Sequence, residues 1–229
     1  DVVDAHNPQS LLWGLAAAAR AGVPNRIATL HSVFEQSERP GLRQPFYRVL
    51  SWLVRRTATE VVTVSEGIRD HAIASGIDAR KVHLLYNGVE TPPVTALRRT
   101  DQPLRIAVVG RMVAVKGHAV LLQALNARRA ELGPFQCIFI GDGEERAKLE
   151  ALVEHYRLGD AVRFLGYRTD VNEQLCRCQI FCMPSFTEGL PYAALEAAAL
   201  RLAIVASRVG GLAQHFEHGV NARLVPAGD

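Results

Sequence analysis

Short apolar runs alternate with amphipathic stretches along the whole chain, and the alternation falls into two series. In the first series the apolar runs have the length and β-branched content of buried strands, and the stretches between them repeat apolar residues at helical spacing. The predicted strands cover residues 2–6, 26–30, 61–64 and 82–86, and the predicted helices cover residues 10–21, 44–56 and 66–75. Ser65 stands where a helix-capping side chain is favoured, and the turn Asn87-Gly88 closes the series.

The second series follows residues 91–103, a stretch with three prolines that is typical of a linker. Its predicted strands cover residues 104–109, 135–140, 162–165, 179–183, 203–207 and 222–225, and its predicted helices cover residues 116–132, 144–156, 170–176 and a segment ending at Leu200. Strands that alternate with helices predict parallel sheets covered by helices. We therefore predict an α/β protein with two Rossmann-like parallel-sheet domains.

The expected domains are a partial N-terminal domain (residues 1–90), the linker (91–103) and a C-terminal domain (104–229). The chain begins inside a strand without a methionine, and a strand stands near its end. From this we expect a fragment of a longer protein, with the first domain incomplete.

The composition is that of a globular protein, because 48% of the 229 residues are hydrophobic and 21% are charged. A formal net charge of +3 fits an anionic small ligand or a transient contact with an acidic membrane, and it is no nucleic-acid signature. No apolar run approaches the roughly 18–20 residues that cross a bilayer, and no signal peptide opens the chain. We expect a cytoplasmic protein whose contact with the inner membrane, if any, is peripheral.

The four cysteines (Cys137, Cys176, Cys178 and Cys182) lack paired CxxC spacing and nearby histidines. They therefore predict buried free thiols in a reducing compartment and no metal site.

Glycines follow five consecutive strands of the second series. They are Gly110, Gly141 with Gly143, Gly166, Gly189, and Gly210 with Gly211. The carboxyl ends of parallel strands share one edge of the sheet, and ligands bind at that edge in open α/β proteins. One such glycine would be an ordinary turn, whereas five in register predict a crevice built from loops.

Charged residues accompany these glycines. Arg111 follows Gly110 directly, and Lys116 opens the predicted helix, a combination that suits a diphosphate. Glu188 lies in the loop before Pro191, and Glu196 lies in the helix after it, which is almost wholly apolar and is expected to be covered on most sides. Two carboxylates beside a helix start suit a polyhydroxylated, anionic ligand. From these residues alone, solvated surface glutamates are an equally good interpretation.

Dinucleotide cofactors and P-loop chemistry fit the sequence poorly. Gly141-Asp142-Gly143 is followed by Glu144 and Glu145, so the third glycine of the dinucleotide fingerprint is missing. No Walker sequence is present either.

Together these segments resemble the retaining glycosyltransferases of family four, which have the GT-B fold. In the second half the matching segments are Val109-Gly110-Arg111-Met112 with Lys116-Gly117, Gly141-Asp142-Gly143, Phe164-Leu165-Gly166, Pro184 through Glu196 as an E-x7-E motif, and Val209-Gly210-Gly211. In the first half they are Thr29-Leu30-His31, Val64-Ser65-Glu66 and Tyr86-Asn87-Gly88-Val89. The resemblance covers essentially the whole chain.

The resemblance implies a role for each candidate residue. Arg111 and Lys116, with Gly110, would bind the diphosphate of a nucleotide-sugar donor and neutralise the leaving nucleotide, so that no metal or other cofactor is needed. Glu188 would contact the donor sugar, and Glu196 the ribose hydroxyls.

The remaining contacts would come from the loops and from the first domain. Backbone groups near Gly189, Leu190 and Pro191 would meet sugar and phosphate, and Gly166 with Tyr167 would meet the base. His31 would contact the transferring sugar near the reacting centre. The acceptor would be a glycan, a lipid-linked molecule or a small molecule, and no nucleic acid is expected as a partner.

Several alternatives stay open. Without the resemblance His31 is better interpreted as a core histidine, and His6 keeps that interpretation. Residues 44–56 could lie on an acidic membrane, although a helix packed on the sheet is favoured. Arg201 and Ala203 stand where the family usually has glycine and proline, and Gln214 stands where a glutamate is common. A nucleotide-sugar epimerase and a non-catalytic binding module are the alternative functions.

Overall fold

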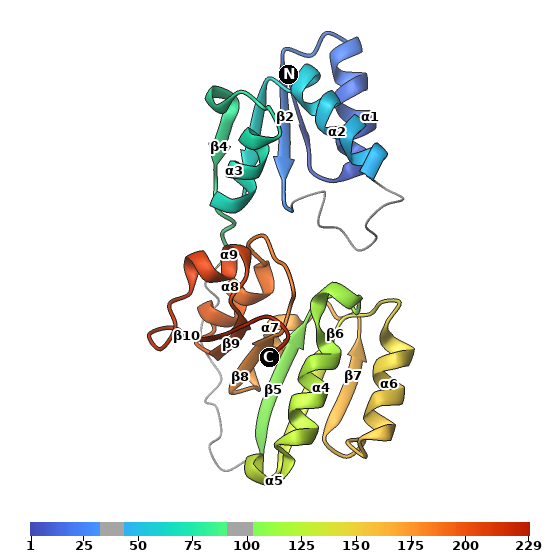
Figure 1. The fold of residues 1–229 in the computed structure, drawn as a ribbon, viewed down its shortest axis with the longest axis vertical. Coiled ribbons are helices and arrows are strands. Elements are labelled where there is room, and N and C mark those ends of the chain that lie inside the picture. The colour runs from blue at the N-terminus through green and yellow to red at the C-terminus, as the bar shows by residue number, and fades with distance from the viewer. Residues whose placement is uncertain (33–43, 91–102) are drawn as a thin grey trace. The chain divides into compact units, whose positions relative to one another are not determined.

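The computed structural model describes residues 1–32, 44–90 and 103–229, and it divides into two compact units (Figure 1). The first unit comprises Asp1–Asn87 with Glu188–Leu190, and the second comprises Gly88–Thr187 with Pro191–Asp229. Most of the expected linker, residues 91–102, lies outside the described residues. No described helix is both long enough and apolar enough to cross a membrane.

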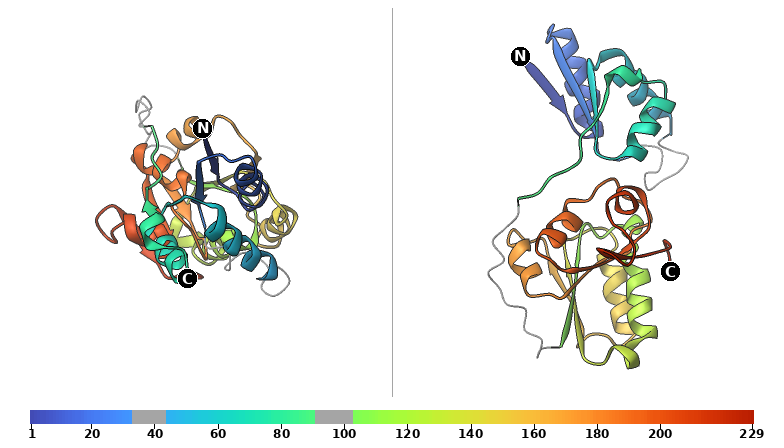
Figure 2. Two further views of the ribbon diagram at one scale, coloured as in Figure 1. Left: turned by 90° about the horizontal axis from the view of Figure 1, so that it is seen from above. Right: turned by 90° about the vertical axis from the view of Figure 1, so that its left-hand side faces the viewer.

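The first unit is a four-stranded parallel sheet with the strands in chain order. Its strands are β1 (Val2–Ala5), β2 (Asn25–Leu30), β3 (Glu60–Thr63) and β4 (Val82–Leu84). Its helices are α1 (Pro8–Arg20), α2 (Gln44–Thr57) and α3 (Glu66–Ala74), with a 3-10 turn η2 (Ala79–Lys81). Right-handed crossovers between neighbouring strands place the helices on one face, where α1 packs against α2 (Figures 1 and 2).

Helices α1 and α3 of the first unit begin at side-chain caps. Asn7 accepts a hydrogen bond from the backbone N–H of Ser10, and the Ser10 hydroxyl accepts one from Asn7 in return. Ser65 caps α3 by accepting from the N–H of Ile68, as its position in the sequence predicted. The first N–H groups of α1 and α3 are therefore partly satisfied within the protein.

The second unit is a six-stranded parallel sheet with the strand order β10-β9-β8-β5-β6-β7. Its strands are β5 (Leu104–Val109), β6 (Phe135–Ile140), β7 (Val162–Gly166), β8 (Ile180–Met183), β9 (Ala203–Ser207) and β10 (Ala222–Val225). Counted from β5, this is the order of a doubly wound Rossmann fold. The chain reverses direction across the sheet between β5 and β8, so these two strands flank the switch point.

Helices cover both faces of this sheet. On one face α4 (His118–Ala127) and α6 (Arg146–His155) pack over a core that includes Leu122, Phe139 and Leu149. On the other face α7 (Val171–Cys176), α8 (Tyr192–Ala199) and α9 (Gly210–His215) pack over a core that includes Phe181 and Ala197. The α/β class with two parallel sheets, predicted from the alternating pattern, is confirmed.

The predicted helix at residues 116–132 was wrong in its extent. A 3-10 turn η3 (Ala114–Lys116) comes first, α4 begins at His118, and a separate short helix α5 (Arg129–Leu132) follows. Gly117 interrupts the first junction because it is left-handed, with φ 64° and ψ 20°. Arg128 interrupts the second junction with φ −110° and ψ 14°. Lys116 therefore precedes the helix instead of opening it.

Helix α8 is less covered than its composition predicted. Ala194 and Ala197 are its buried residues, while Tyr192 is 49% exposed and Glu196 is half-buried. The helix spans only eight residues, so one stripe at helical spacing faces the sheet and the rest stays accessible. Pro191 is its N-cap, and the helix begins at Tyr192.

Candidate functional site

The loops that follow β5 and β8 are joined at the switch point of the second sheet. The backbone N–H of Phe186 donates to the carbonyl of Val115 across 2.8 Å. Gly117 lies so close to the other loop that a Cβ atom there would come 2.0 Å from the Pro184 carbonyl oxygen. Together with the left-handed backbone, this contact requires glycine. The two loops are therefore held together by main-chain contacts, and the crevice that the glycine pattern predicted stays a prediction.

The loops after β5, β6 and β7 are connected by further backbone hydrogen bonds. Gly110 donates to Ile140, Met112 donates to the Asp142 carbonyl, and Gly141 donates to Gly166, over 3.0, 2.9 and 2.8 Å. These hydrogen bonds place three of the predicted glycines, Gly110, Gly141 and Gly166, along one edge. The edge is backbone-lined, so a ligand could approach the main chain closely.

Two cations stand at this edge. The Arg111 side chain is exposed, and Lys116 is half-buried with its Cε 3.9 Å from the Cβ position of Gly110. Lys116 also contributes to the pKa of His118, the first residue of α4. Burial first, and then the charge of Lys116, lower the pKa of His118 to about 4, so this imidazole is neutral near pH 7. The positive charge of the site therefore comes from Arg111 and Lys116.

Helices α4 and α8 both begin at this edge without a capping side chain. The N-cap of α4 is Gly117 and that of α8 is Pro191, and neither makes a side-chain hydrogen bond to its helix. The first N–H groups of a helix have no partner within it, and they carry the positive end of its dipole. An anion placed at the switch point would lie near the positive ends of both α4 and α8.

The predicted carboxylates and base-binding residues have different settings. Glu196 lies in α8, one turn from its start, and is half-buried. Tyr167 is 83% exposed directly after β7, where its ring is accessible for stacking. Glu188, Gly189 and Leu190 lie in the chain between β8 and α8 but belong to the first unit.

Asp142 has a structural role that the sequence pattern did not reveal. Its carboxylate accepts from the N–H of Gly143 at 2.8 Å and pairs with Arg146 at 3.0 Å. These contacts, that of Gly143 foremost, lower the pKa of Asp142. The carboxylate therefore fixes the loop after β6.

A second polar cluster lies at the carboxyl ends of β1 and β2 in the first unit. His6 Nδ1 is 3.0 Å from His31 Nε2, His6 Nε2 is 3.1 Å from Asp4 Oδ2, and the Thr29 hydroxyl donates to Asp4 Oδ1 at 2.8 Å. Treating His6 as a core histidine was wrong, because its side chain is 53% exposed. The signal was available, since both histidines directly follow neighbouring parallel strands.

The cluster constrains the tautomer of His31. The Asp4 carboxylate only accepts, so His6 carries a proton on Nε2. When His6 is neutral, it accepts at Nδ1 from the Nε2–H of His31, and the Nδ1 of a neutral His31 ring is then an acceptor. Burial, and then His6, lower the pKa of His31, while Asp4 raises it. The net direction is downward, which favours the neutral ring.

Two known protein-family profiles match this chain. The sequence profile described as glycosyl transferases group 1 matches residues 103–229, more than half of the chain, and that described as glycosyltransferase family 4 matches residues 1–92. The chain belongs to the group 1 glycosyltransferase family.

Curated relatives of this group 1 chain agree. It is 30% identical to the α-maltose-1-phosphate synthase of Mycolicibacterium smegmatis, over 98% of the chain and 64% of that protein. It is 34% identical to the D-inositol 3-phosphate glycosyltransferase of Corynebacterium urealyticum, over 77% of the chain and 45% of that protein. It is 33% identical to the amylovoran biosynthesis glycosyltransferase AmsK of Erwinia amylovora, over 69% of the chain and 41% of that protein. The chain thus spans between two fifths and two thirds of these relatives.

Solved structures agree on the fold. Anabaena HepE in complex with UDP-glucose superimposes with a TM-score of 0.88 at 24% identity, over 100% of this chain and 65% of that chain. Sucrose-phosphate synthase from Thermosynechococcus elongatus gives 0.81 at 20% identity, over 100% of this chain and 61% of that one. The GT-B arrangement of two Rossmann-like sheets, expected from the motifs, is confirmed.

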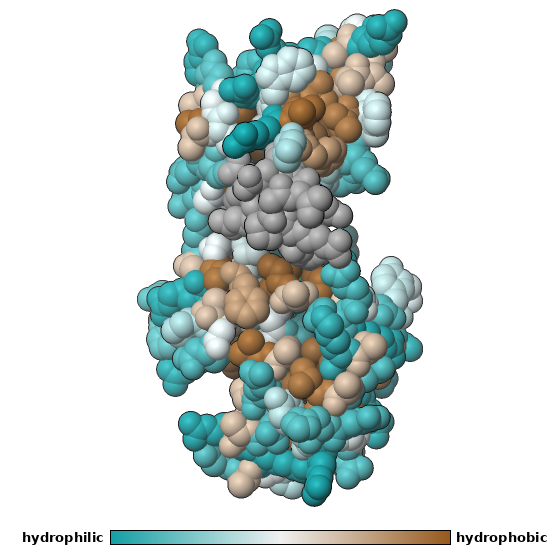
Figure 3. Space-filling view, turned by 45° about the vertical axis from the view of Figure 1, so that its right-hand side comes forward, coloured by the Kyte–Doolittle hydropathy of each residue, from teal (hydrophilic) through white to brown (hydrophobic). Residues whose placement is uncertain are grey.

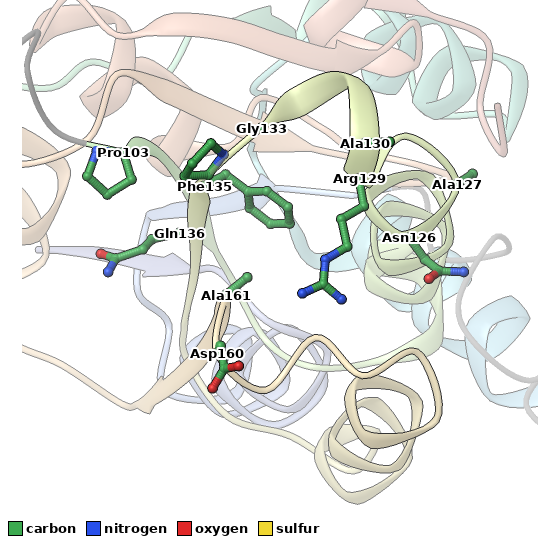
Figure 4. A pocket seen from close by; sticks show the side chains of 11 residues that line it. Pro103, Asn126, Ala127, Arg129, Ala130, Gly133, Phe135, Gln136, Asp160 and Ala161 are labelled. Carbon is green, nitrogen blue, oxygen red and sulfur yellow. The ribbon is translucent and has the colours of Figure 1, made fainter.

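The group 1 chain also has a pocket at the opposite, amino-terminal edge of the second sheet (Figure 4). Its volume is about 820 Å³, and its lining includes Arg129, Phe135 and Asp160. The Arg129 guanidinium donates to the carbonyl of Arg157 at 2.8 Å. This pocket is remote from the glycine loops because it lies where the strands begin.

Within the described ranges, the chain has no group of three or more histidine, cysteine or acidic side chains placed to hold a metal ion. Cys137, Cys176, Cys178 and Cys182 are all free thiols. Burial raises the pKa of Cys182 to about 12, so that thiol is protonated at neutral pH.

Proposed function

We propose that this chain carries the donor site of a retaining glycosyltransferase, which moves a sugar from a nucleotide-diphosphate sugar to an acceptor. The observation that carries the proposal is the switch point between β5 and β8. There the uncapped starts of α4 and α8 lie at the same edge as Arg111 and Lys116. Dipole ends and cations at a water-accessible crevice are suited to a diphosphate.

In this proposal the diphosphate lies against the N–H groups of α4 and α8. Arg111 and Lys116 neutralise the charge that develops on the leaving nucleotide, so the site would need no metal ion and no other cofactor. Glu196 accepts hydrogen bonds from the ribose hydroxyls, and Tyr167, with Gly166, contacts the base. Glu188 and the backbone of Gly189, Leu190 and Pro191 meet the sugar and its phosphate.

His31 is the proposed residue of the first unit at the reacting sugar. With neutral His6, its Nδ1 accepts a hydrogen bond from a sugar hydroxyl, and this contact orients the anomeric carbon for attack on the same face. The domain boundaries we propose remain residues 1–90, 91–103 and 104–229.

The names of related proteins support particular substrates. The Anabaena structure contains UDP-glucose, which favours a uridine nucleotide and a hexose. The Erwinia relative is named for amylovoran biosynthesis, which favours a role in polysaccharide synthesis on the cytoplasmic side. We accordingly propose a glycan or lipid-linked acceptor and no nucleic-acid partner.

Calorimetric titration with UDP, GDP and ADP tests the donor site. We expect one nucleotide to bind, with an affinity that a metal chelator leaves unchanged and that Arg111→Ala lowers at least tenfold, a loss of about 1.4 kcal/mol. Arg177→Ala, which removes an exposed arginine at the end of α7, is the matched control. Equal affinities for Arg111→Ala and the unaltered chain would remove the diphosphate assignment.

Transfer is tested separately with the matching sugar nucleotide and a panel of acceptors. We expect His31→Ala to keep the nucleotide affinity within about twofold and to lose transfer. Nucleotide binding without any product would make the chain a binding module. Conversion of the sugar nucleotide without an acceptor would make it an epimerase.

A further inference from the structure

Both tryptophans of the chain lie on the surface of neighbouring helices. Trp13 is 72% exposed in α1 and Trp52 is 50% exposed in α2. Single exposed apolar side chains are common, whereas several that gather on adjoining helices indicate an interaction site. They are therefore a candidate contact surface.

The two helices turn these tryptophans away from the sheet. In α2 the buried residues are Tyr47, Leu50 and Val54, and at 100° per residue Trp52 lies on the opposite side of the helix. In α1 the buried residues are Leu11, Leu15 and Ala18, and Trp13 again lies opposite them. Because α1 and α2 cover the same face of the first sheet, the two outward faces adjoin.

Arginines surround the aromatic residues on these outward faces. Arg48, Arg55 and Arg56 flank Trp52, and the guanidinium carbon of Arg56 lies 5.8 Å from the centre of its ring. Arg20 lies two turns after Trp13 on the same side of α1. Neither helix contains an aspartate or glutamate.

Val49 extends this surface toward the start of α2, where its side chain is 54% exposed. Phe46 is 39% exposed but lies one turn before the buried Leu50, so it is outside the outward face. Figure 3 shows brown, hydrophobic residues on the first unit. Trp13, Val49, Trp52 and the four arginines are called the tryptophan–arginine face below.

We propose that the tryptophan–arginine face docks on an anionic lipid bilayer. Arginines without carboxylate neighbours are complementary to acidic headgroups, and tryptophan with aliphatic residues inserts at the level where hydrocarbon meets headgroup. An acidic protein would complement only the charge of the arginines. A bilayer also takes up the exposed tryptophan and aliphatic side chains.

This docking also narrows the acceptor, and in that respect it rests on the proposed function. Helices α1 and α2 run back from the carboxyl edge of the first sheet, so Trp13 and Val49 lie in the halves of the helices nearest that edge. The same edge carries His31. A bilayer held there favours a lipid-linked acceptor whose sugar end reaches His31.

Tryptophan fluorescence of the whole chain, titrated with vesicles, measures the docking directly. The chain has two tryptophans, so the emission reports only on this face. With vesicles that contain about 30% phosphatidylglycerol we expect a blue shift, and with pure phosphatidylcholine little change. Because each arginine near an anionic surface contributes roughly fivefold in affinity, replacing Arg48, Arg55 and Arg56 together by Gln should weaken binding on the order of a hundredfold.

Matched variants distinguish docking through the tryptophan–arginine face from general attraction between a positively charged protein and the vesicle. Replacing Arg163, Arg177 and Arg223, which are exposed in the second unit, by Gln removes the same charge and should leave vesicle affinity within about threefold. The single-tryptophan variants Trp13→Phe and Trp52→Phe should each keep a blue shift. Equal weakening by both triple variants, binding to neutral vesicles alone, or association between copies without vesicles would overturn the proposal. Vesicle binding without nucleotide binding would leave it standing and remove the proposed function.

Discussion

The two parallel sheets differ at their carboxyl edges. In the first unit, α1 and α3 begin at Asn7 and Ser65, whose side chains take up N–H groups of the first turn. In the second unit, α4 and α8 begin at Gly117 and Pro191, which offer no side-chain acceptor. The polar groups at the first edge are thus side chains, whereas at the second edge they are largely main-chain N–H groups.

This difference separates two kinds of chemistry on one type of fold. Main-chain N–H groups at fixed positions bind a phosphate whatever else the ligand carries. A side chain such as that of His31 can instead orient one hydroxyl through a ring nitrogen. Under the proposed function, the second unit binds the anion and the first unit positions the reacting group.

The largest expected effect comes from Gly117→Ala. The new Cβ would lie 2.0 Å from the Pro184 oxygen, and the left-handed backbone adds about 1–3 kcal/mol of strain, so the β5 and β8 loops must separate. We expect the unfolding free energy to fall by at least that amount and nucleotide binding to fall below detection. Thermal denaturation and calorimetry measure both effects.

Gly159→Ala is the control for this change, because a Cβ at Gly159 would meet nothing within 4 Å. It should alter neither stability nor affinity appreciably. Full nucleotide affinity in Gly117→Ala would mean that the joined loops do not form the donor site.

A smaller loss of nucleotide affinity is expected when α8 is given a capping side chain like those of α1 and α3. Pro191 has φ −74° and ψ 127°, an extended geometry in which an aspartate can accept from the first turn of α8. Pro191→Asp should therefore lower nucleotide affinity about tenfold, because its carboxylate occupies the N–H groups and repels the diphosphate. Calorimetry of Pro191→Ala, which adds no acceptor, should show an affinity within about twofold of the unaltered chain.

Removing a helix cap from the first unit is the counterpart of adding one to α8. Asn7→Ala removes a cap and should cost about 1 kcal/mol of stability while leaving nucleotide affinity unchanged. If Pro191→Asp and Pro191→Ala bind nucleotide equally well, the start of α8 does not contact the diphosphate.

Local sequence patterns predicted the strands well, because short apolar runs rich in β-branched and aromatic residues have few other structures available. They failed where a distant contact decides the structure. The helix over residues 116–132 was predicted too long because nothing near Gly117 reveals that Pro184 lies against it. The order of the six strands, which creates the switch point, was likewise not predicted.

The candidate site was partly predictable for the same reason. Glycines, Arg111 and Lys116 stand next to strand ends, so the parallel sheet alone brings them to one edge. The roles of His6, Asp142 and His118 depend on partners in other elements or on burial. For His6, the position of two histidines after neighbouring strands was the one available signal.

The smallest expected effects concern the titration of His31 and test the first edge alone. Replacing His6 by Gln removes a neighbour that lowers the pKa of His31, so that pKa should rise. Replacing Asp4 by Asn removes the group that raises it, so the pKa should fall. Proton NMR of the imidazole signals measures both, and shifts in the same direction would contradict the cluster geometry.

The sign of the accompanying change in stability follows from the same pKa. His31 titrates below its ordinary value of 6.5 in the folded protein, so the unfolded chain takes up this proton first as the pH falls. Its contribution to stability is therefore complete above about pH 6.5 and is lost progressively below that value. His6→Gln should reduce this loss and Asp4→Asn should increase it, which denaturant titrations at pH 7.5 and pH 5.5 would measure. If both variants lose the same stability between pH 7.5 and pH 5.5, burial alone determines the pKa of His31. His6 and Asp4 would then not influence that pKa.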